Sequence, residues 1–381
     1  IKAIFRIATS DSNGGSTFKD VTITVNGTND VPVISSSSDT TGAVTEAGHN
    51  DNGTTFSGTP SASGTLVSTD VDNNSSASWS IYGASSGTYG SISVTSAGVW
   101  TYTLDNSLTA TQSLKEGDIQ YETFTARVTD DKGAVADQVI TITVNGSNDV
   151  PVITTAISDQ VFSEAGDAAS QDLSASGSIA FSDVDALSTI DVSSSLKTAA
   201  VWSGGTIPTS LKTALESAFS ISGTDVSAPG SVNWSYNTTG LDLDFINANE
   251  SVSLTFTVTI TDDQGATASD DVTITINGTN DAPVISGVVS LGSIQEDGSF
   301  TITSEQLLSN ASDADGDQLS IAYVKVTKGS GELTSNQDGT WTFTPNANWN
   351  GPVSFDYAVT DGRTTTSTLS INGIERDGSL Y

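Results

Sequence analysis

Acidic residues recur along the chain in a fixed order. Three times the sequence presents a Glu beside Ala-Gly or Asp-Gly, then an Asp-x-Asp pair, then an Asp in a Gly-containing turn. In the first copy these are Glu46, Asp70, Asp72 and Asp130. Ca²⁺ takes six to eight oxygen ligands, whereas Zn²⁺ prefers His or Cys, of which the chain has one and none. The repeated carboxylates therefore predict calcium binding.

Catalysis is a poorer use of these residues. His49 is the only histidine and lies in the polar loop AGHNDNG, which predicts a solvated side chain. A Ser-His-Asp mechanism would depend on that one residue. Paired carboxylates could act as the acid and nucleophile of a glycosidase, but one of them should then lie in an apolar cleft. Every pair here falls in a turn beside a repeat boundary, so we do not expect an enzyme.

The charge balance argues against nucleic acid as a partner. Asp and Glu number 45 against 12 Lys and Arg, which gives a formal net charge of −33. A surface this negative repels the phosphates of nucleic acid and opposes compaction unless cations neutralise part of it. The chain has no Cys for disulfides. No apolar run approaches the roughly 18 residues of a membrane span, so membrane insertion of this segment is not expected.

A nine-residue segment separates the repeats and serves as the joint between them. It occurs at 26–34 (NGTNDVPVI), 145–153 (NGSNDVPVI) and 277–285 (NGTNDAPVI). Each copy follows a β-rich run, and an Asp in a hairpin-type turn lies 15 residues before each copy, at Asp11, Asp130 and Asp262. Imperfect copies head to tail predict a linear array of domains.

The alternating apolar pattern and frequent turn signals predict an all-β chain of tandem Ig-like or cadherin-like β-sandwiches, with about seven strands in each. The one convincing helical pattern, PTSLKTALESAF, lies at 208–219. The predicted domains are the C-terminal hairpin of a truncated preceding repeat (1–29), a first sandwich (30–148), a second sandwich containing the short helix (149–280) and a third sandwich (281–381).

Strand parity predicts where the carboxylates meet. If a joint enters at one end of a sandwich, the turn after the first strand lies at the far end, and the Asp-x-Asp and hairpin turns lie at the near end. Each joint should then gather residues from its own turns and the Glu of the preceding domain. The predicted cation ligands are Asn29, Asp30, Asp70, Asp72 and Asp130 at the first joint; Glu46, Asn148, Asp149, Asp183, Asp185 and Asp262 at the second; and Glu164, Asn280, Asp281, Asp313, Asp315 and Asp361 at the third.

Two groups of tryptophans carry different expectations. Trp79, Trp100, Trp234 and Trp341 lie in alternating strand segments and are predicted to be core residues. Trp202 and Trp349 are the aromatics that exposed binding surfaces could use. Glu296, in QEDG, is the third repeat's counterpart of Glu46.

Several motifs carry a family resemblance. VTITVNGTNDVPVI (21–34) and ITITVNGSNDVPVI (140–153), followed by TEAG or SEAG and Asp-Val-Asp, resemble VCBS repeats of giant RTX-type bacterial surface adhesins. The third repeat, with QEDGSF, SDADGDQL and GTWTFTPNANWNGPVSFDYAVTDG, is similar to bacterial cadherin-like repeats. The long second repeat and the degenerate last joint near Asn372 depart from the pattern. The resemblance implies secretion, calcium-stiffened extension from the cell surface and a role in adhesion or biofilm cohesion.

These observations predict an extracellular extender segment that spaces a binding domain from a bacterial cell. Its expected partners are calcium ions and neighbouring repeats of the same long chain. One alternative is a filament subunit, in which the N-terminal hairpin pairs with other copies by strand complementation. A second alternative is a carbohydrate- or protein-binding module.

Overall fold

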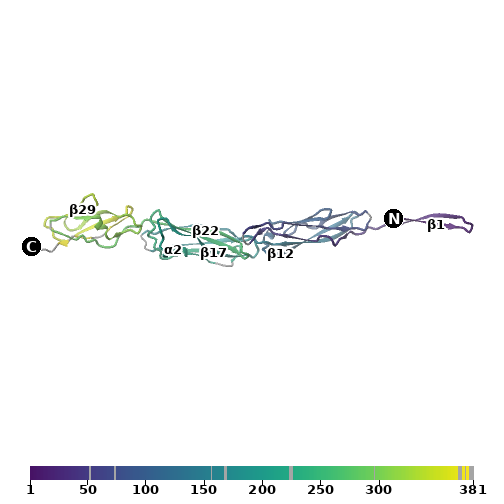
Figure 1. Cartoon of the computed structure of the whole chain (residues 1–381), viewed down its shortest axis with the longest axis horizontal. Coiled ribbons are helices and arrows are strands. Elements are labelled where there is room, and N and C mark those ends of the chain that lie inside the picture. Colours follow the sequence, from purple (N-terminus) through teal and green to yellow (C-terminus); the bar gives the residue numbers. More distant parts are fainter. Residues whose placement is uncertain are drawn as a thin grey trace. The chain divides into compact units, whose positions relative to one another are not determined.

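The computed structural model describes residues 1–50, 53–72, 74–155, 157–166, 170–222, 226–295, 297–367, 371–373 and 375–376 (Figure 1). Glu296 lies outside these residues. The chain divides into two compact units. The first comprises Ile1–Pro151 with the segments Asp183–Thr189 and Thr261–Thr267, and the second comprises Val152–Ser182, Ile190–Ile260 and Ala268–Tyr381. No helix in the described part of the chain is long and apolar enough to cross a membrane.

The first unit begins with a two-stranded hairpin of β1 (Lys2–Ser10) and β2 (Ser16–Thr24). Their register pairs Phe5 with Val21, and these side chains share one apolar face with Ile7 and Ile23. The exposed fractions of these four side chains run from 40% to 54%. The sequence forms the hairpin locally, without burying its apolar face.

A β-sandwich follows in the same unit. Its larger sheet has the order β4-β13-β12-β9 and its smaller sheet the order β10-β11-β7. The strands are β4 (Thr41–Thr45), β7 (Ser61–Thr65), β9 (Ala77–Tyr82), β10 (Gly90–Val94), β11 (Val99–Leu104), β12 (Ile119–Asp130) and β13 (Val135–Asn145). Smaller elements are the pairs β3 (Val33–Ile34) with β8 (Ser68–Thr69) and β5 (Gly48–His49) with β6 (Thr55–Phe56), and the short helix α1 (Thr109–Gln112).

The core of this sandwich follows from the period of its strands. Every second residue is buried from Glu122 to Asp130 in β12 and from Ile140 to Val144 in β13, including Phe124, Val128 and Ile142. These side chains belong to one core with Trp100 and Tyr102, which are fully buried. The indole Nε1 of Trp100 donates a hydrogen bond to the Asp39 carbonyl at 2.8 Å, so its one polar atom is satisfied inside the core.

The second unit holds most of the next sandwich. Its sheets have the orders β14-β16-β20-β18 and β15-β22-β21-β17-β19. The strands are β14 (Val152–Ile153), β15 (Gln160–Ser163), β16 (Ser174–Ser182), β17 (Thr189–Trp202), β18 (Phe219–Ser222), β19 (Val226–Ser227), β20 (Gly230–Asn237), β21 (Ser251–Asp262) and β22 (Thr267–Asn277). The predicted helix is present as α2 (Thr209–Glu216), and it buries Leu211 and Leu215 against this core.

The second unit ends with a further sandwich. One sheet has the order β25-β29-β28, and in the other β30 pairs with β27, β31 and β32. The elements are β23 (Val284–Ile285), β24 (Ser293–Ile294), β25 (Phe300–Thr303), α3 (Ser304–Leu308), β26 (Ala311–Ser312), β27 (Ser320–Lys328), β28 (Gly331–Ser335), β29 (Thr340–Pro345), β30 (Val353–Thr360), β31 (Thr365–Ser367), β32 (Ile371–Gly373) and β33 (Glu375–Arg376). Phe343, Phe355 and Tyr357 are fully buried in its core.

The tryptophans sort largely as expected. Trp79, Trp100 and Trp234 are buried, and Trp341 is half-buried against the last core. The prediction that Trp202 offers an exposed surface was wrong. Its ring is half-buried and packs edge-on to Phe245 at 4.7 Å between centroids, and its Nε1 donates to Glu250 at 3.0 Å. Trp349 is 37% exposed.

Candidate metal centres

One hydrogen bond is repeated at all three joints. The side-chain amide of the joint Asn donates to a carboxylate oxygen of the Asp in the Gly-containing turn of the following sandwich, which is the last residue of β12 or β21, or the residue just after β30. The donor–acceptor distances are 2.8 Å for Asn29 and Asp130, 3.0 Å for Asn148 and Asp262, and 2.7 Å for Asn280 and Asp361. The joint segment is therefore fixed to the same turn in each repeat.

The turn itself explains why Asp occupies this position. The Oδ1 atom of Asp130 accepts the backbone N–H groups of Lys132 and Ala134 at 2.9 and 2.8 Å, while Gly133 supplies the positive φ of 92°. The hydrogen bond from Asn29 holds the pKa of Asp130 below its ordinary value. The predicted ligands Asp130, Asp262 and Asp361 thus each anchor a turn and a joint Asn.

A second repeated bond joins each joint to the Asp-x-Asp turn. The backbone N–H of the joint Asp donates to Oδ2 of the second Asp in the pair, at 2.9 Å for Asp30 and Asp72, 2.9 Å for Asp149 and Asp185, and 2.8 Å for Asp281 and Asp315. In the first two turns that second Asp donates its own N–H to the first Asp, at 2.8 Å for Asp72 and 3.0 Å for Asp185. The first of these bonds turns the carboxylate of the second Asp toward the joint, and the second bond orders the Asp-x-Asp turn.

The first joint is the most open of the three. It brings together all five of its predicted residues through the bonds just described. The Asp30 side chain is exposed, while Asp70 and Asp72 are half-buried. Within the described residues, Oδ2 of Asp70 is buried and has no hydrogen-bond partner.

The second joint is enclosed within the first unit. Glu46 is fully buried, and Asp149 and Asp185 are 9% and 4% exposed. Oε1 of Glu46 accepts a hydrogen bond from Nε2 of Gln112 at 2.9 Å. In the part of the chain that the structure describes, Oε2 of Glu46, Oδ2 of Asp149 and Oδ1 of Asp185 are buried without a partner. Three carboxylates therefore present unsatisfied oxygens at one joint.

Burial makes these groups difficult to ionise together. Burial, and then the charge of Asp149, raises the pKa of Glu46 to about 8. Burial raises the pKa of Asp185 to about 7, against hydrogen bonding from the Asp149 N–H. The negative charges of Asp183 and Asp149 also raise the pKa of Asp185. A clustered set of this kind is destabilised at neutral pH unless protons or a cation neutralise it.

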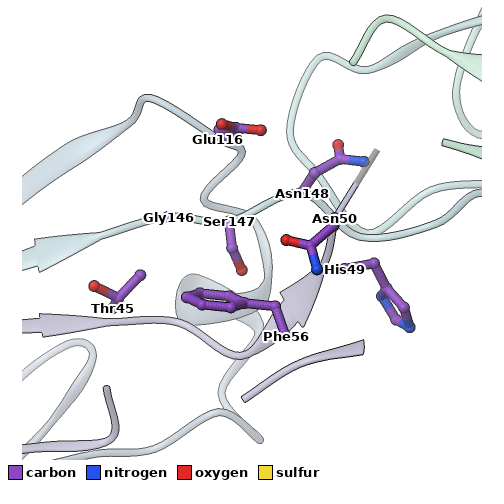
Figure 2. Close-up of a pocket in the computed structure, with 8 residues that line it drawn as sticks. All are labelled: Thr45, His49, Asn50, Phe56, Glu116, Gly146, Ser147 and Asn148. Carbon is purple, nitrogen blue, oxygen red and sulfur yellow. The ribbon is translucent and has the colours of Figure 1, made fainter. Parts of the chain in front are cut away.

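His49 is placed differently from its prediction. The sequence predicts a solvated side chain, yet the side chain is only 26% exposed and its Nδ1 lies 3.4 Å from Oδ1 of Asp149. It borders a pocket of about 650 Å³ that Phe56, Asn50 and Glu116 also line (Figure 2). The loop folds back because the His49 N–H donates to the Asn148 carbonyl at 2.6 Å.

The third joint, in the second unit, contains two clusters of carboxylates, and each cluster could hold an ion. Oxygens of Glu164, Asp244 and Asp281 all lie within 4.8 Å of one another, as do those of Asp313, Asp315 and Asp317. Glu164 is 3% exposed, and its Oε2 accepts both the N–H and the hydroxyl of Thr279 at 2.9 Å. Its Oε1 is buried with no partner among the described residues.

Sequence reasoning did not include Asp244, Asp317 or Gln112. Asp317 carries a visible signal, because it continues the alternation of Asp313 and Asp315. Asp244 and Gln112 carry none, because each lies far along the chain from the Glu that it approaches. Burial raises the pKa of Asp315 to about 6, which matches the crowding at this joint.

The donor chemistry of the joints fits a hard divalent cation. A buried carboxylate oxygen without a donor is costly, and the described residues include several at the joints: Glu46 Oε2, Asp70 Oδ2, Asp149 Oδ2, Glu164 Oε1, Asp185 Oδ1, Asp313 Oδ2 and Asp315 Oδ1. An oxygen-rich, flexible set of this kind suits Ca²⁺ better than Zn²⁺. The residues present are thus compatible with calcium.

Replacing Asn148 with Ala is expected to lower the free energy of unfolding by about 1–3 kcal/mol, because a buried charged acceptor on Asp262 loses its donor. Thermal or urea unfolding in chelator measures the change. The matched control is Asn13→Ala, at an exposed position in the hairpin turn, which should change stability little. Equal effects of the two substitutions would contradict the role given to Asn148.

Comparison with known proteins agrees with the fold. A family model for bacterial cadherin-like domains matches residues 29–146, and a cadherin-like domain model matches residues 279–373. The chain is therefore a tandem array of cadherin-like β-sandwiches. Neither matching model describes a catalytic family.

Similar solved structures include extracellular segments of cadherins. The protocadherin gammaB4 extracellular domain is 17% identical with a TM-score of 0.42, and the match covers 99% of this chain and 56% of that one. Domains 1–5 of protocadherin gamma B2 are 13% identical with a TM-score of 0.40 and coverages of 98% and 65%. Domains 22–24 of mouse cadherin-23 are 16% identical with a TM-score of 0.42 and coverages of 92% and 99%. The chain thus spans less than two thirds of the first two structures. No curated protein matches it.

Proposed function

We propose that this chain is a calcium-stiffened extender segment of a secreted bacterial cell-surface adhesin. The observation that carries the proposal is the repeated joint. At each one, an Asn-to-Asp bond and an Asp N–H-to-Asp bond hold unsatisfied carboxylates at the point where the sequence passes from one β-sandwich repeat to the next.

In this proposal, the chain's own residues position the ligands at each joint. The joint Asn fixes the segment to the hairpin turn, and the joint Asp N–H orients the Asp-x-Asp pair. The buried Glu46 or Glu164 closes the group from the preceding sandwich. Calcium, when bound, would neutralise the clustered charge and link these segments. In its absence, repulsion among the carboxylates would loosen the joint.

The bacterial surface setting is supported by two further observations. The joint motifs resemble VCBS repeats of RTX-type adhesins, and the bacterial cadherin-like family model matches residues 29–146. An extender of this kind would hold a binding domain away from the cell and contribute to adhesion or biofilm cohesion. Its partners would be calcium ions and neighbouring repeats of the same protein.

Small-angle X-ray scattering of the full chain tests the stiffening. We expect the maximum dimension to increase and its distribution to narrow when calcium replaces chelator, because the joints become ordered. The variant Asp149→Asn/Asp185→Asn, which removes two charges at the second joint, should show a smaller change. Identical scattering in calcium and chelator would contradict the proposed stiffening.

The exposed hairpin favours a second candidate function, assembly of a filament by strand complementation. Its apolar face carries Phe5, Ile7, Val21 and Ile23, and a two-stranded edge can accept further strands. Light scattering over a range of concentrations in calcium separates the candidates. An extender stays monomeric, whereas a filament subunit grows in mass, and Phe5→Ser/Val21→Ser would abolish the growth. Ile4→Ser, on the opposite face, is the control.

A further inference from the structure

The second and third joints differ at one equivalent position. Gln112 and Asp244 each lie 18 residues before the hairpin Asp of their sandwich, which is Asp130 or Asp262. The backbone confirms the correspondence. Three residues after Asp244 lies Asn247, whose carbonyl faces Gly278, and three residues after Gln112 lies Lys115, whose carbonyl faces Gly146.

Both side chains lie against the buried Glu of the joint, but with different chemistry. Nε2 of Gln112 donates to Oε1 of Glu46 at 2.9 Å. The carboxylate of Asp244 instead lies within 4.8 Å of the oxygens of both Glu164 and Asp281. The second joint therefore has a neutral amide where the third has a negative charge.

The two glutamates themselves are closely matched. Glu46 is 0% exposed and Glu164 is 3% exposed. Each keeps one buried carboxylate oxygen, Oε2 in Glu46 and Oε1 in Glu164, with no hydrogen-bond partner in the described parts of the chain. Each oxygen is thus a preformed ligand atom for a cation, and the neighbour at position 112 or 244 sets how many charges surround that cation.

A second difference also gives the third joint more negative charge than the second joint. Asp317 follows the Asp-x-Asp pair of the third joint, where the second joint has Leu187 with 89% exposure. Arg363 offsets part of this charge, because its NH1 atom lies 3.9 Å from Oδ2 of Asp317 and 3.0 Å from Oδ1 of Asn280. These contacts place the Arg363 side chain beside Asp317 and Asn280.

We propose that Asp244 gives the third joint a tighter Ca²⁺ site than Gln112 allows at the second joint, so that the two joints take up calcium at different concentrations. This inference rests on the proposed function. Calcium affinity follows the number of charged oxygen ligands, so one carboxylate should change the dissociation constant by on the order of tenfold. As calcium rises, the third joint would become ordered before the second.

Calorimetric titration of the full chain with CaCl₂ tests the difference. Glu46→Gln and Glu164→Gln assign the signals, because each removes the binding class of one joint. Asp244→Gln should then weaken calcium binding at the third joint, identified by Glu164→Gln, by on the order of tenfold. Gln112→Asp should tighten calcium binding at the second joint, identified by Glu46→Gln, by a similar factor. The double exchange should reverse the order of the two joints.

The outcomes separate this inference from the function on which it rests. Calcium binding in which neither exchange shifts its assigned class overturns the difference alone. A wild-type chain that takes up no calcium overturns the proposed function and this inference with it. Gln112→Asp adds a ligand at a different joint from Asp244→Gln, so it remains a test if the latter variant fails to fold, which circular dichroism in chelator would show.

Discussion

Saturation with calcium is expected to raise the unfolding free energy of the chain more than any other change of conditions. A ligand that binds only the folded state at about 1,000 times its dissociation constant adds about 4 kcal/mol for each site. Because calcium is proposed to bind at more than one joint, the increments should accumulate over the array. Differential scanning calorimetry of the full chain in excess CaCl₂ and in chelator measures the change in Tm.

General screening of the net charge of −33 would also stabilise the chain, so the control is sodium chloride at matched ionic strength. Magnesium is the second control, because it demands near-octahedral geometry and gives up its waters reluctantly. The account predicts a large rise in Tm with calcium and small rises with the other two salts. Equal rises with all three would show that screening, not site binding, stabilises the chain.

In chelator, the chain is expected to gain stability as the pH falls from about 8 towards 5. The folded chain raises the pKa of Glu46 from its ordinary 4.5 to about 8, and that of Asp185 from 3.8 to about 7. A group whose pKa is raised by folding contributes stability below its unfolded pKa and loses it as the pH rises through the folded pKa. The gain should reach a few kcal/mol, since each unit of pKa corresponds to about 1.4 kcal/mol and the two shifts overlap, because the charge of Asp185 is one of the causes that raise the pKa of Glu46.

Glu46→Gln is the matched variant for this prediction, because it keeps the shape of the side chain and removes the titrating charge. In chelator near pH 8 it should be more stable than the wild type, and its stability should depend less on pH. In calcium it should be less stable, because a ligand is lost. Chemical unfolding from pH 5 to 8 measures both effects, and a slope unchanged by the substitution would contradict the buried charge at the second joint.

Most of the fold could be predicted from periodic features of the sequence. The alternating strand segments predict that their tryptophans lie in the cores, and in the structure Trp79, Trp100 and Trp234 are buried. The helical spacing of Leu211 and Leu215 likewise predicts α2. These patterns involve residues close together in the chain, so they can be recognised in a single sequence. Strand parity extended the argument to the joints, because it brought Glu46 towards Asp149 across about 100 residues of chain.

Features without a local signal could not be predicted. Asp244 approaches Glu164 from 80 residues further along the chain, and no spacing rule connects an Asp in LDLDF with a Glu in SEAG. His49 was misplaced because the fold of its loop depends on a hydrogen bond to the Asn148 carbonyl. Trp202 was misplaced because its partner Phe245 lies in another segment. The anchoring role of the hairpin Asp residues depends on bonds that become visible only once the turn is built.

The central claim is that the Asn-Asp joints bind calcium, and direct titration of the full chain by calorimetry tests it. The matched variant Asp72→Asn/Asp185→Asn/Asp315→Asn keeps the size of three side chains, one at each joint, and removes their charge. The account predicts saturable, chelator-reversible calcium binding by the wild type and a severe loss of affinity in the variant. Absence of binding heat at millimolar calcium, or equal binding by the variant, would contradict it.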